Sequence, residues 1–281
     1  MQICARKQEV RDRVASLRRQ GQTIGLVPTM GFLHEGHLSL VREAARRTDR
    51  VIVSIFVNPT QFGPNEDLAT YPRDPEGDLA KLRAEGVEAV FMPDVEEMYG
   101  ARGDTFVEVP GLSGVLQGAL RPGHFRGVST VVTKLFNIIQ PDVAVFGEKD
   151  FQQLAIIRQM VRDLDMPLQI AGHPTVREDD GLAMSSRNVR LSPEHRAQAP
   201  ALNRSLAAAA ALAPSRPGIA SLESTIRAVL AEAPGGKVES VDIRDAATLA
   251  PLTGELDREA VILLAVRFGP VLLIDQRVIA P

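Results

Sequence analysis

The feature that most constrains the fold is a pair of apolar runs separated by a helical pattern. Residues 51–57 read VIVSIFV, a mostly β-branched run with little alternation, as expected for a strand covered on both faces. Residues 23–27 form a shorter apolar run, and residues 37–47 between the two carry apolar side chains at helical spacing. These segments predict a right-handed βαβ unit, in which both strands end at one edge of a parallel sheet.

The same alternation continues to about residue 171. It predicts further helices over residues 9–19, 74–86, 127–139 and 151–164, and further strands over residues 87–91, 105–109, 143–146 and 168–171. Repeated alternation of strands and helices is typical of α/β proteins. We therefore expect a doubly wound parallel sheet of the Rossmann-like type.

The pattern changes beyond Pro174. Helices are predicted over residues 193–213 and 219–231, followed by strands over residues 237–243, 260–266 and 271–274, of which the last two form a hairpin. We expect a first domain of residues 1–175 and a smaller α+β domain of residues 176–281.

Composition indicates a globular protein that acts on small molecules. Of 281 residues, 44% are hydrophobic and 24% charged, and 32 Lys and Arg against 35 Asp and Glu give a net charge of −3, which favours neither a nucleic-acid nor a membrane partner. The single Cys4 cannot form an internal disulfide. Without a signal-peptide pattern or an apolar stretch of roughly twenty residues, a cytoplasmic location is expected.

A polar turn with two glycines follows the first apolar run. His34 and His37 lie three residues apart at the predicted helix entrance, and Gly31 and Gly36 allow the backbone to approach a ligand closely. Unpaired N–H groups at a helix start favour phosphate oxygens, so a nucleoside triphosphate is the expected ligand. The alternatives are histidines that only cap the helix, or a zinc site, which is disfavoured because no Cys or further His follows at ligand spacing.

Residues 28–37 (PTMGFLHEGH) resemble the His-x-Gly-His signature in the form found in the pantothenate synthetase (pantoate–β-alanine ligase) family of the nucleotidyltransferase superfamily. Residues 54–62, residues 121–128 leading to 146–153, and residues 180–188 also resemble this family and follow its order. The resemblance implies a nucleotidyltransferase-type fold, a small C-terminal domain that covers the active site, and a homodimer. It also implies ATP-dependent condensation of pantoate with β-alanine through pantoyl adenylate, with AMP and pyrophosphate released.

The resemblance also implies residue roles. It assigns ATP binding to Met30, Gly31, Phe32, Leu33, His34, Glu35, Gly36, His37, Gly147, Glu148, Lys149, Asp150, Val176, Met184, Ser185, Ser186 and Arg187. It assigns catalysis to His34, His37, Lys149, Ser185, Ser186 and Arg187, and binding of pantoate or β-alanine to Met30, Asn58, Gln61 and Gln153. Asp78 matches a position linked to a metal, and Mg²⁺ is expected to accompany the triphosphate.

The residue types suit this chemistry. Negative charge builds on the triphosphate during adenylation, and Lys149 and Arg187 supply a compact and a forked cation to meet it. Gln61 and Gln153 offer neutral amide donors, which bind a carboxylate without a competing salt bridge.

Each assignment also has a plainer alternative. Lys149 and Gln153 are also readable as exposed surface side chains, and residues 184–187 as an ordinary loop. Two further groups are open in the same way. The basic residues Arg121, His124 and Arg126 form either a flap over the triphosphate or merely charges on a loop. The apolar residues Pro28, Met30, Val132 and Leu135 either line a wall for the dimethyl group of pantoate or simply pack in the core.

Two other functions compete with the ligase. An adenylyltransferase that keeps the nucleotide in its product would require more cations for a phosphorylated acceptor, whereas Gln61 and Gln153 favour a small polar acid. A non-catalytic nucleotide-binding regulator would be expected to have lost motif residues such as His37 and Lys149, which are present.

Overall fold

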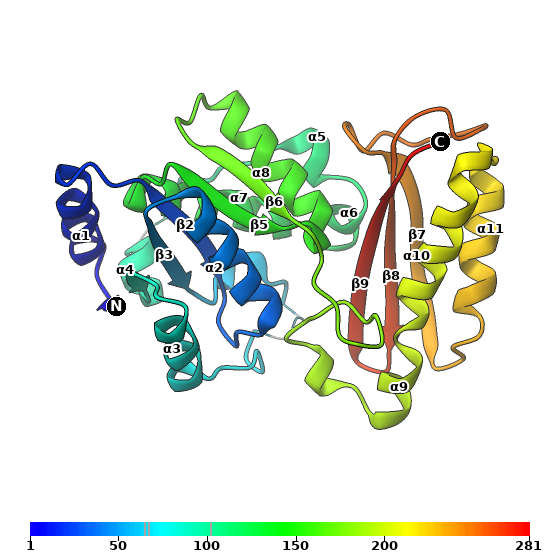
Figure 1. Ribbon diagram of the computed structural model, residues 1–281, viewed down its shortest axis with the longest axis horizontal. Coiled ribbons are helices and arrows are strands. Elements are labelled where there is room, and N and C mark those ends of the chain that lie inside the picture. Colours follow the sequence, from blue (N-terminus) through cyan, green and yellow to red (C-terminus); the bar gives the residue numbers. More distant parts are fainter. Residues whose placement is uncertain (65, 67, 102) are drawn as a thin grey trace. The chain divides into compact units, whose positions relative to one another are not determined.

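Residues 1–64, 66, 68–101 and 103–281 are described by the structure, a computed structural model shown in Figure 1. The chain forms two compact units, the first of Met1–Gly147 with Gln152–His173 and the second of Glu148–Phe151 with Pro174–Pro281. The boundary was expected near residue 175. The short segment Glu148–Phe151 groups with the C-terminal part because the 3-10 turn η2 (Glu148–Asp150) packs against the last strand, β9 (Val271–Ile279). None of the helices formed by the described residues is long and apolar enough to cross a membrane.

The first unit contains a six-stranded parallel sheet in the order β1-β4-β3-β2-β5-β6, which confirms the predicted α/β class. Its strands are β1 (Gln2–Cys4), β2 (Ile24–Thr29), β3 (Arg50–Ile55), β4 (Ala89–Phe91), β5 (Val143–Gly147) and β6 (Gln169–His173). From β2 the chain runs outward through β3 to β4, and then returns to place β5 on the other side of β2. The carboxyl ends of β2 and β5 therefore meet at a topological switch point, where open α/β sheets bind ligands.

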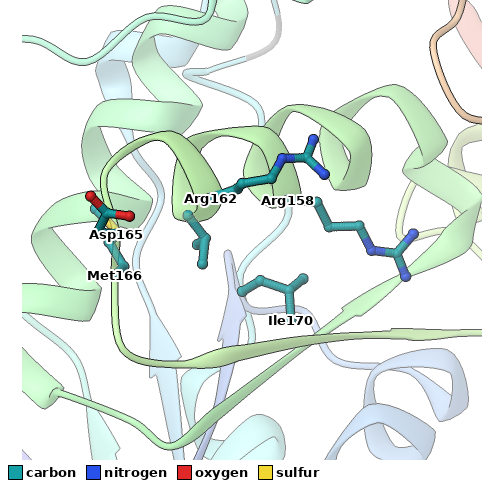
Figure 2. A pocket seen from close by; sticks show the side chains of 6 residues that line it. Arg158, Arg162, Asp165, Met166 and Ile170 are labelled. Carbon is teal, nitrogen blue, oxygen red and sulfur yellow. The ribbon is translucent and has the colours of Figure 1, made fainter.

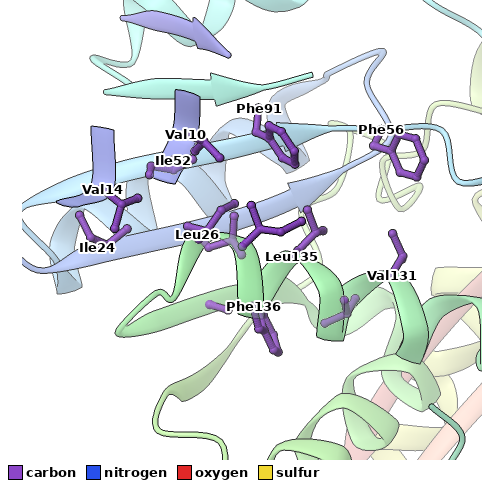
Figure 3. Close-up of a cluster of buried hydrophobic side chains, with 14 of the residues drawn as sticks. Val10, Val14, Ile24, Leu26, Ile52, Phe56, Phe91, Val131, Leu135 and Phe136 are labelled. Carbon is purple, nitrogen blue, oxygen red and sulfur yellow. The ribbon is translucent and has the colours of Figure 1, made fainter. Parts of the chain in front are cut away.

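Helices cover both faces of this sheet. The longer ones are α1 (Lys7–Arg19), α2 (Glu35–Arg47), α3 (Pro75–Ala84), α7 (His124–Ile139) and α8 (Phe151–Asp163), and the short ones are η1 (Pro59–Gln61), α4 (Val95–Tyr99), α5 (Pro110–Ser113) and α6 (Gln117–Leu120). Alternate strand residues enter different cores: Leu26 packs with α1, α7 and α8, and Val27 with α2 and α3. Figure 3 shows part of the first core, in which Val131 and Leu135 of α7 lie against the sheet.

Three details of the first unit differ from expectation. The first strand, predicted over residues 23–27, extends further, because β2 continues through Pro28 to Thr29. Pro28 has no N–H group to donate to a neighbouring strand. No such bond is required on the β5 side, because β5 pairs only with Gly25 and Leu26 of β2. The strand predicted over residues 105–109 is also absent among the described residues, because the N–H of Val107 donates to the Thr130 hydroxyl of α7 (3.0 Å) and not to a strand. The edge strand β1 was not predicted.

The second unit packs helices on an antiparallel sheet, as predicted for an α+β domain. Its sheet has the order β7-β8-β9, with β7 (Gly236–Asp245), β8 (Ala260–Phe268) and β9. Phe268 pairs with Val271, which confirms the predicted hairpin. The helices are α9 (Pro193–Gln198), α10 (Ala201–Leu212) and α11 (Ile219–Leu230), with the 3-10 turns η3 (Asn188–Arg190) and η4 (Ala213–Ser215). The single helix predicted over residues 193–213 is divided at Pro200, which has no N–H to continue the helical ladder.

Candidate active site

A buried carboxylate fixes the backbone of the loop that follows β2. Gly31 has φ +84° and Phe32 has φ 53°, so two successive residues lie in the left-handed region. The Asp78 carboxylate, 1% exposed at the start of α3, accepts hydrogen bonds from the N–H groups of Phe32 and Leu33, both at 2.7 Å. A Cβ on Gly31 would meet Asp78 at 3.1 Å and Ile55 at 3.0 Å, so only glycine fits this turn without strain.

The metal role expected for Asp78 stays a prediction. Each of its two carboxylate oxygens accepts one backbone N–H group. Across residues 1–64, 66, 68–101 and 103–281, no three His, Cys, Asp or Glu side chains gather closely enough to hold a metal ion. Asp78 therefore shapes the loop.

Replacing Asp78 by asparagine is expected to lower the free energy of unfolding by about 1–3 kcal/mol, because an amide NH₂ group would face a buried N–H donor. Urea unfolding of the variant tests this. Glu76→Gln, an exposed carboxylate in the first turn of the same helix, is the matched control. Equal midpoints for the two variants would contradict the role given to Asp78.

The two histidines lie together where α2 begins. Their ring centroids are 4.1 Å apart. His34 is the N-cap residue, and its Nδ1 accepts the N–H of Gly36 (3.2 Å), while Nδ1 of His37 accepts the N–H of His34 (3.3 Å). Because each Nδ1 is an acceptor, the proton of each neutral ring lies on Nε2. The capping alternative is thus correct for His34, and the same bonds fix both rings as Nε2–H donors.

Gln61, Asn58 and Met30 lie together after β3 and β2. The Gln61 amide donates to the sulfur of Met30 (3.4 Å) and accepts from the Asn58 amide (3.1 Å). Asn58 is 1% exposed, and it also donates to the Gly127 carbonyl (3.2 Å) and accepts from the Tyr99 hydroxyl (2.7 Å). Asn58 therefore orients Gln61 through buried hydrogen bonds.

Helix α7 holds the other side of the Gln61 segment. A Cβ on Gly127 would lie 2.5 Å from the Thr60 carbonyl oxygen, so this glycine allows η1 to approach α7 closely. Nδ1 of His124 lies 2.8 Å from the Gln61 carbonyl, and Arg121 pairs with Glu66 (2.5 Å). Arg126 lies over the Phe106 ring (4.9 Å). His124 and Arg126 lie in the first turn of α7 and not on a loop. The flap over the triphosphate stays a prediction.

The residues around Gln61 line a cavity of about 680 Å³ within the first unit. Its wall includes Gln61, Tyr99, Arg121, His124 and Arg126. A second, shallower hollow of about 560 Å³ lies between α8 and the amino-terminal end of β6, with Arg158 and Ile170 in its wall (Figure 2). None of the expected site residues lines this second hollow.

The expected glutamine of α8 has a buried neighbour. Gln153 is half-buried in the first turn of α8. Gln152 is 4% exposed, and its amide donates to the carbonyls of Leu112 and Val115, both at 2.8 Å. Gln152 thus anchors the α5–α6 segment, a role that the sequence did not predict.

The remaining residues expected at the ATP site within the first unit are Glu35 and Gly147. Glu35 is exposed and pairs with Arg42 on the surface of α2, and Gly147 is the last residue of β5. Gly36 and Leu33 belong to the same loop and helix start as the histidines. The first unit therefore places one set of expected residues at the carboxyl ends of β2, β3 and β5.

The second unit holds the other expected residues. Lys149 lies in η2 between Glu148 and Asp150. Burial lowers the pKa of the Lys149 ammonium, and the carboxylates of Asp150 and Asp275 act against this shift. The Arg187 guanidinium lowers the same pKa further. Lys149 is half-buried, so it is not the fully solvated surface charge of the plainer alternative.

Residues 176–184 form a tight hairpin in the second unit. The N–H of Met184 donates to the Val176 carbonyl (3.0 Å), and Arg177 bridges to Ala183. Directly after it, the Ser185 hydroxyl accepts the N–H of Arg187 (3.2 Å).

The Asn188 amide ties the end of this segment to the hairpin. It donates to Glu178 (2.8 Å) and to the Ala183 carbonyl (3.1 Å). Ser186, at 9% exposed, is buried. Residues 184–187 are thus a braced turn, and the hydrogen bonds of Asn188 were not predicted.

A doubly wound sheet with a histidine-capped helix at its switch point defines an α/β protein of the nucleotide-binding class. Comparison with known proteins gives the family. The sequence profile of the family described as pantoate-beta-alanine ligase matches residues 2–278, and the chain belongs to this family of ligases.

Individual relatives agree over nearly the whole length. The chain is 53% identical over 263 residues to a pantothenate synthetase of Geobacter sulfurreducens, covering 93% of each protein. It is similar to the crystal structure of pantothenate synthetase from Thermus thermophilus, with a TM-score of 0.94, 46% identity and 100% of both chains covered. A ligase from Francisella tularensis, solved with beta-gamma ATP and beta-alanine, has a TM-score of 0.81 and 35% identity, with 99% of this chain and 97% of that chain covered.

Proposed function

We propose that this protein condenses (R)-pantoate with β-alanine at the expense of ATP, giving pantothenate, AMP and pyrophosphate through pantoyl adenylate. The observation that carries this proposal is the fixed pair of Nε2–H donors on His34 and His37 at the switch point of the sheet, in a chain of this family. The ligase from Francisella tularensis was solved with beta-gamma ATP and beta-alanine, which supports ATP and β-alanine as substrates here.

In the first step, a pantoate carboxylate oxygen attacks the α-phosphorus of ATP, and the bond from that phosphorus to the pyrophosphate oxygen breaks. Negative charge grows on the phosphate oxygens during this attack, so fixed donors and cations lower the barrier. We assign this role to the Nε2–H of His37 and His34, the Lys149 ammonium, and the hydroxyl and guanidinium groups of Ser185, Ser186 and Arg187.

In the second step, the amine of β-alanine attacks the acyl carbon of pantoyl adenylate. The bond from that carbon to the phosphate oxygen breaks, AMP leaves, and the amine loses a proton as the amide forms. Mg²⁺ would enter with ATP and would offset the negative charge of its phosphates. The homodimer expected from the resemblance stays a prediction.

Pantoate is assigned to the Gln61 side of the site. Gln61 is oriented by Asn58 and lies beside Met30, whose side chain supplies an apolar surface for the dimethyl group. Neutral amides at Gln61 and Gln153 favour a small polar acid over a phosphorylated acceptor. This observation favours the ligase over an adenylyltransferase that keeps its nucleotide.

Gln61→Ala and Gln153→Ala are each expected to raise the KM for pantoate about tenfold, the effect of one lost hydrogen bond to a charged group. The KM for ATP should change little. Gln159→Ala, which removes a glutamine that bonds to Asp163 further along α8, is the matched control. An unchanged pantoate KM would remove the substituted residue from the acid site.

The reaction is tested by measuring pyrophosphate and AMP release from Mg-ATP by the purified protein. Sustained release of both should require pantoate and β-alanine together. The absence of any pantoate-dependent pyrophosphate release would favour the adenylyltransferase alternative, and nucleotide binding without turnover of any acceptor would favour a regulator.

A further inference from the structure

An ion pair with a buried carboxylate joins two distant segments of the second unit. Arg177 and Asp275 are 98 residues apart, and both guanidinium arms contact the carboxylate, Nη1 to Oδ2 at 2.7 Å and Nη2 to Oδ1 at 2.9 Å. Asp275 is 2% exposed, and its Oδ1 also accepts the N–H of Gln276 (2.8 Å). The Arg177 side chain is 20% exposed, so the carboxylate bears most of the desolvation cost of this pair.

The first consequence of this pair concerns the hairpin of residues 176–184. Arg177 follows Val176 directly, pairs with Ala183 across the hairpin, and donates to the Gly181 carbonyl (3.1 Å). A bidentate contact fixes the guanidinium plane in both position and orientation. Asp275 therefore holds the hairpin against β9 and, through it, the Met184 backbone at the start of the serine segment.

The second consequence concerns charge. Asp275 lies on β9, against which η2 packs, and its carboxylate acts on the Lys149 ammonium. The charged groups that act on Lys149 are Asp150 in its own turn, Arg187 after the hairpin, and Asp275 on the strand. Burial and Arg187 lower the pKa of Lys149, whereas Asp150 and, less strongly, Asp275 raise it.

We infer that Asp275 is a positioning residue of the nucleotide site, which clamps the hairpin of residues 176–184 through Arg177. This inference rests on the proposed function, because it takes Lys149 and the hairpin as parts of the ATP site. It assigns a role in nucleotide binding to the C-terminal strand, which carries none of the expected site residues.

The test measures binding of the magnesium complex of α,β-methylene ATP by calorimetry across a range of pH. Asp275→Asn keeps the shape of the side chain but removes its charge. Binding should weaken about tenfold near neutral pH, the effect of one lost charged contact. Removing the negative charge lowers the pKa of Lys149 further, so the decline of binding at alkaline pH should move to lower pH than in the unmodified protein.

Asp242→Asn is the matched control. Asp242 pairs with Arg244 (2.8 Å) on β7, separated from β9 by β8 in the same sheet, and this substitution removes the same charge. It should leave both the affinity and the pH profile unchanged. The inference would be overturned if Asp275→Asn bound the nucleotide with the affinity and the alkaline decline of the unmodified protein. It would also be overturned if Asp242→Asn changed the affinity and the pH profile equally.

Arg177→Lys provides a second test of the clamp if Asp275→Asn does not fold. It keeps the buried charge balance but replaces the two-armed contact by a single ammonium. We expect weaker binding with an unmoved alkaline limb, since this substitution keeps the Asp275 carboxylate in place, and full affinity would overturn the clamp. If the unmodified protein binds no nucleotide, the proposed function fails, whereas normal binding with insensitive variants refutes the inference alone.

Discussion

Replacing Lys149 by alanine is expected to lower pantoate-dependent pyrophosphate release by at least about a hundredfold, the scale of losing one transition-state donor. The ammonium has to be charged to meet the developing negative charge. Because its pKa is held below the ordinary lysine value, adenylation by the unmodified protein should fall as the pH rises through that lowered pKa.

The same substitution should not destabilise the fold. A lysine whose pKa is lowered in the folded state costs stability at neutral pH, where the unfolded chain holds the proton more tightly. Lys149→Ala should therefore leave the free energy of unfolding equal or raised at pH 7. Loss of activity together with stability would indicate a structural role instead.

Lys237→Ala is the matched control for Lys149→Ala. Lys237 is an exposed lysine on β7 of the same unit, and its removal changes the net charge equally. Its pyrophosphate release should match that of the unmodified protein. Near-normal release by Lys149→Ala as well would refute the role assigned to this ammonium.

His37→Ala is expected to lower the adenylation rate by at least about a hundredfold as well, because it removes an oriented Nε2–H donor. His34→Ala should also lower the free energy of unfolding by about 1 kcal/mol, which His37→Ala should not, because His34 caps α2. Rapid-quench measurement of pyrophosphate separates this effect from the second step.

Ser39→Ala controls for damage to the start of α2. The Ser39 hydroxyl donates to the Gly36 carbonyl (2.8 Å), so its loss perturbs the same helical turn without touching either histidine ring. We expect adenylation close to normal. If Ser39→Ala lowers the rate as far as His37→Ala does, helix integrity and not proton donation explains the histidine variant.

Local patterns were enough to predict most of the first unit. The β-branched run at residues 51–57 and the helical spacing of residues 37–47 are local signals. The right-handed crossover rule then predicts that both strands end at one edge of a parallel sheet. Errors occurred where a long-range partner decided the outcome. Residues 105–109 have strand composition, yet Val107 bonds to a side chain of α7.

In the candidate site, too, local motifs were predictable and long-range contacts were not. The resemblance supplied His34, His37, Lys149 and Gln61, and the structure brings them to strand ends and turns. The residues that hold them were harder to predict, because their partners are remote in sequence. Asp78 resembled a metal ligand but accepts two loop N–H groups 45 and 46 residues away.

The most direct test of the two-step ligase follows an oxygen atom. Pantoate labelled with ¹⁸O in its carboxylate is incubated with the protein, Mg-ATP and β-alanine, and the AMP is analysed by mass spectrometry. Attack of the carboxylate on the α-phosphorus transfers one labelled oxygen to AMP when the amine displaces it, so we predict AMP carrying one ¹⁸O. Pantothenate formed alongside unlabelled AMP would contradict the pantoyl adenylate intermediate.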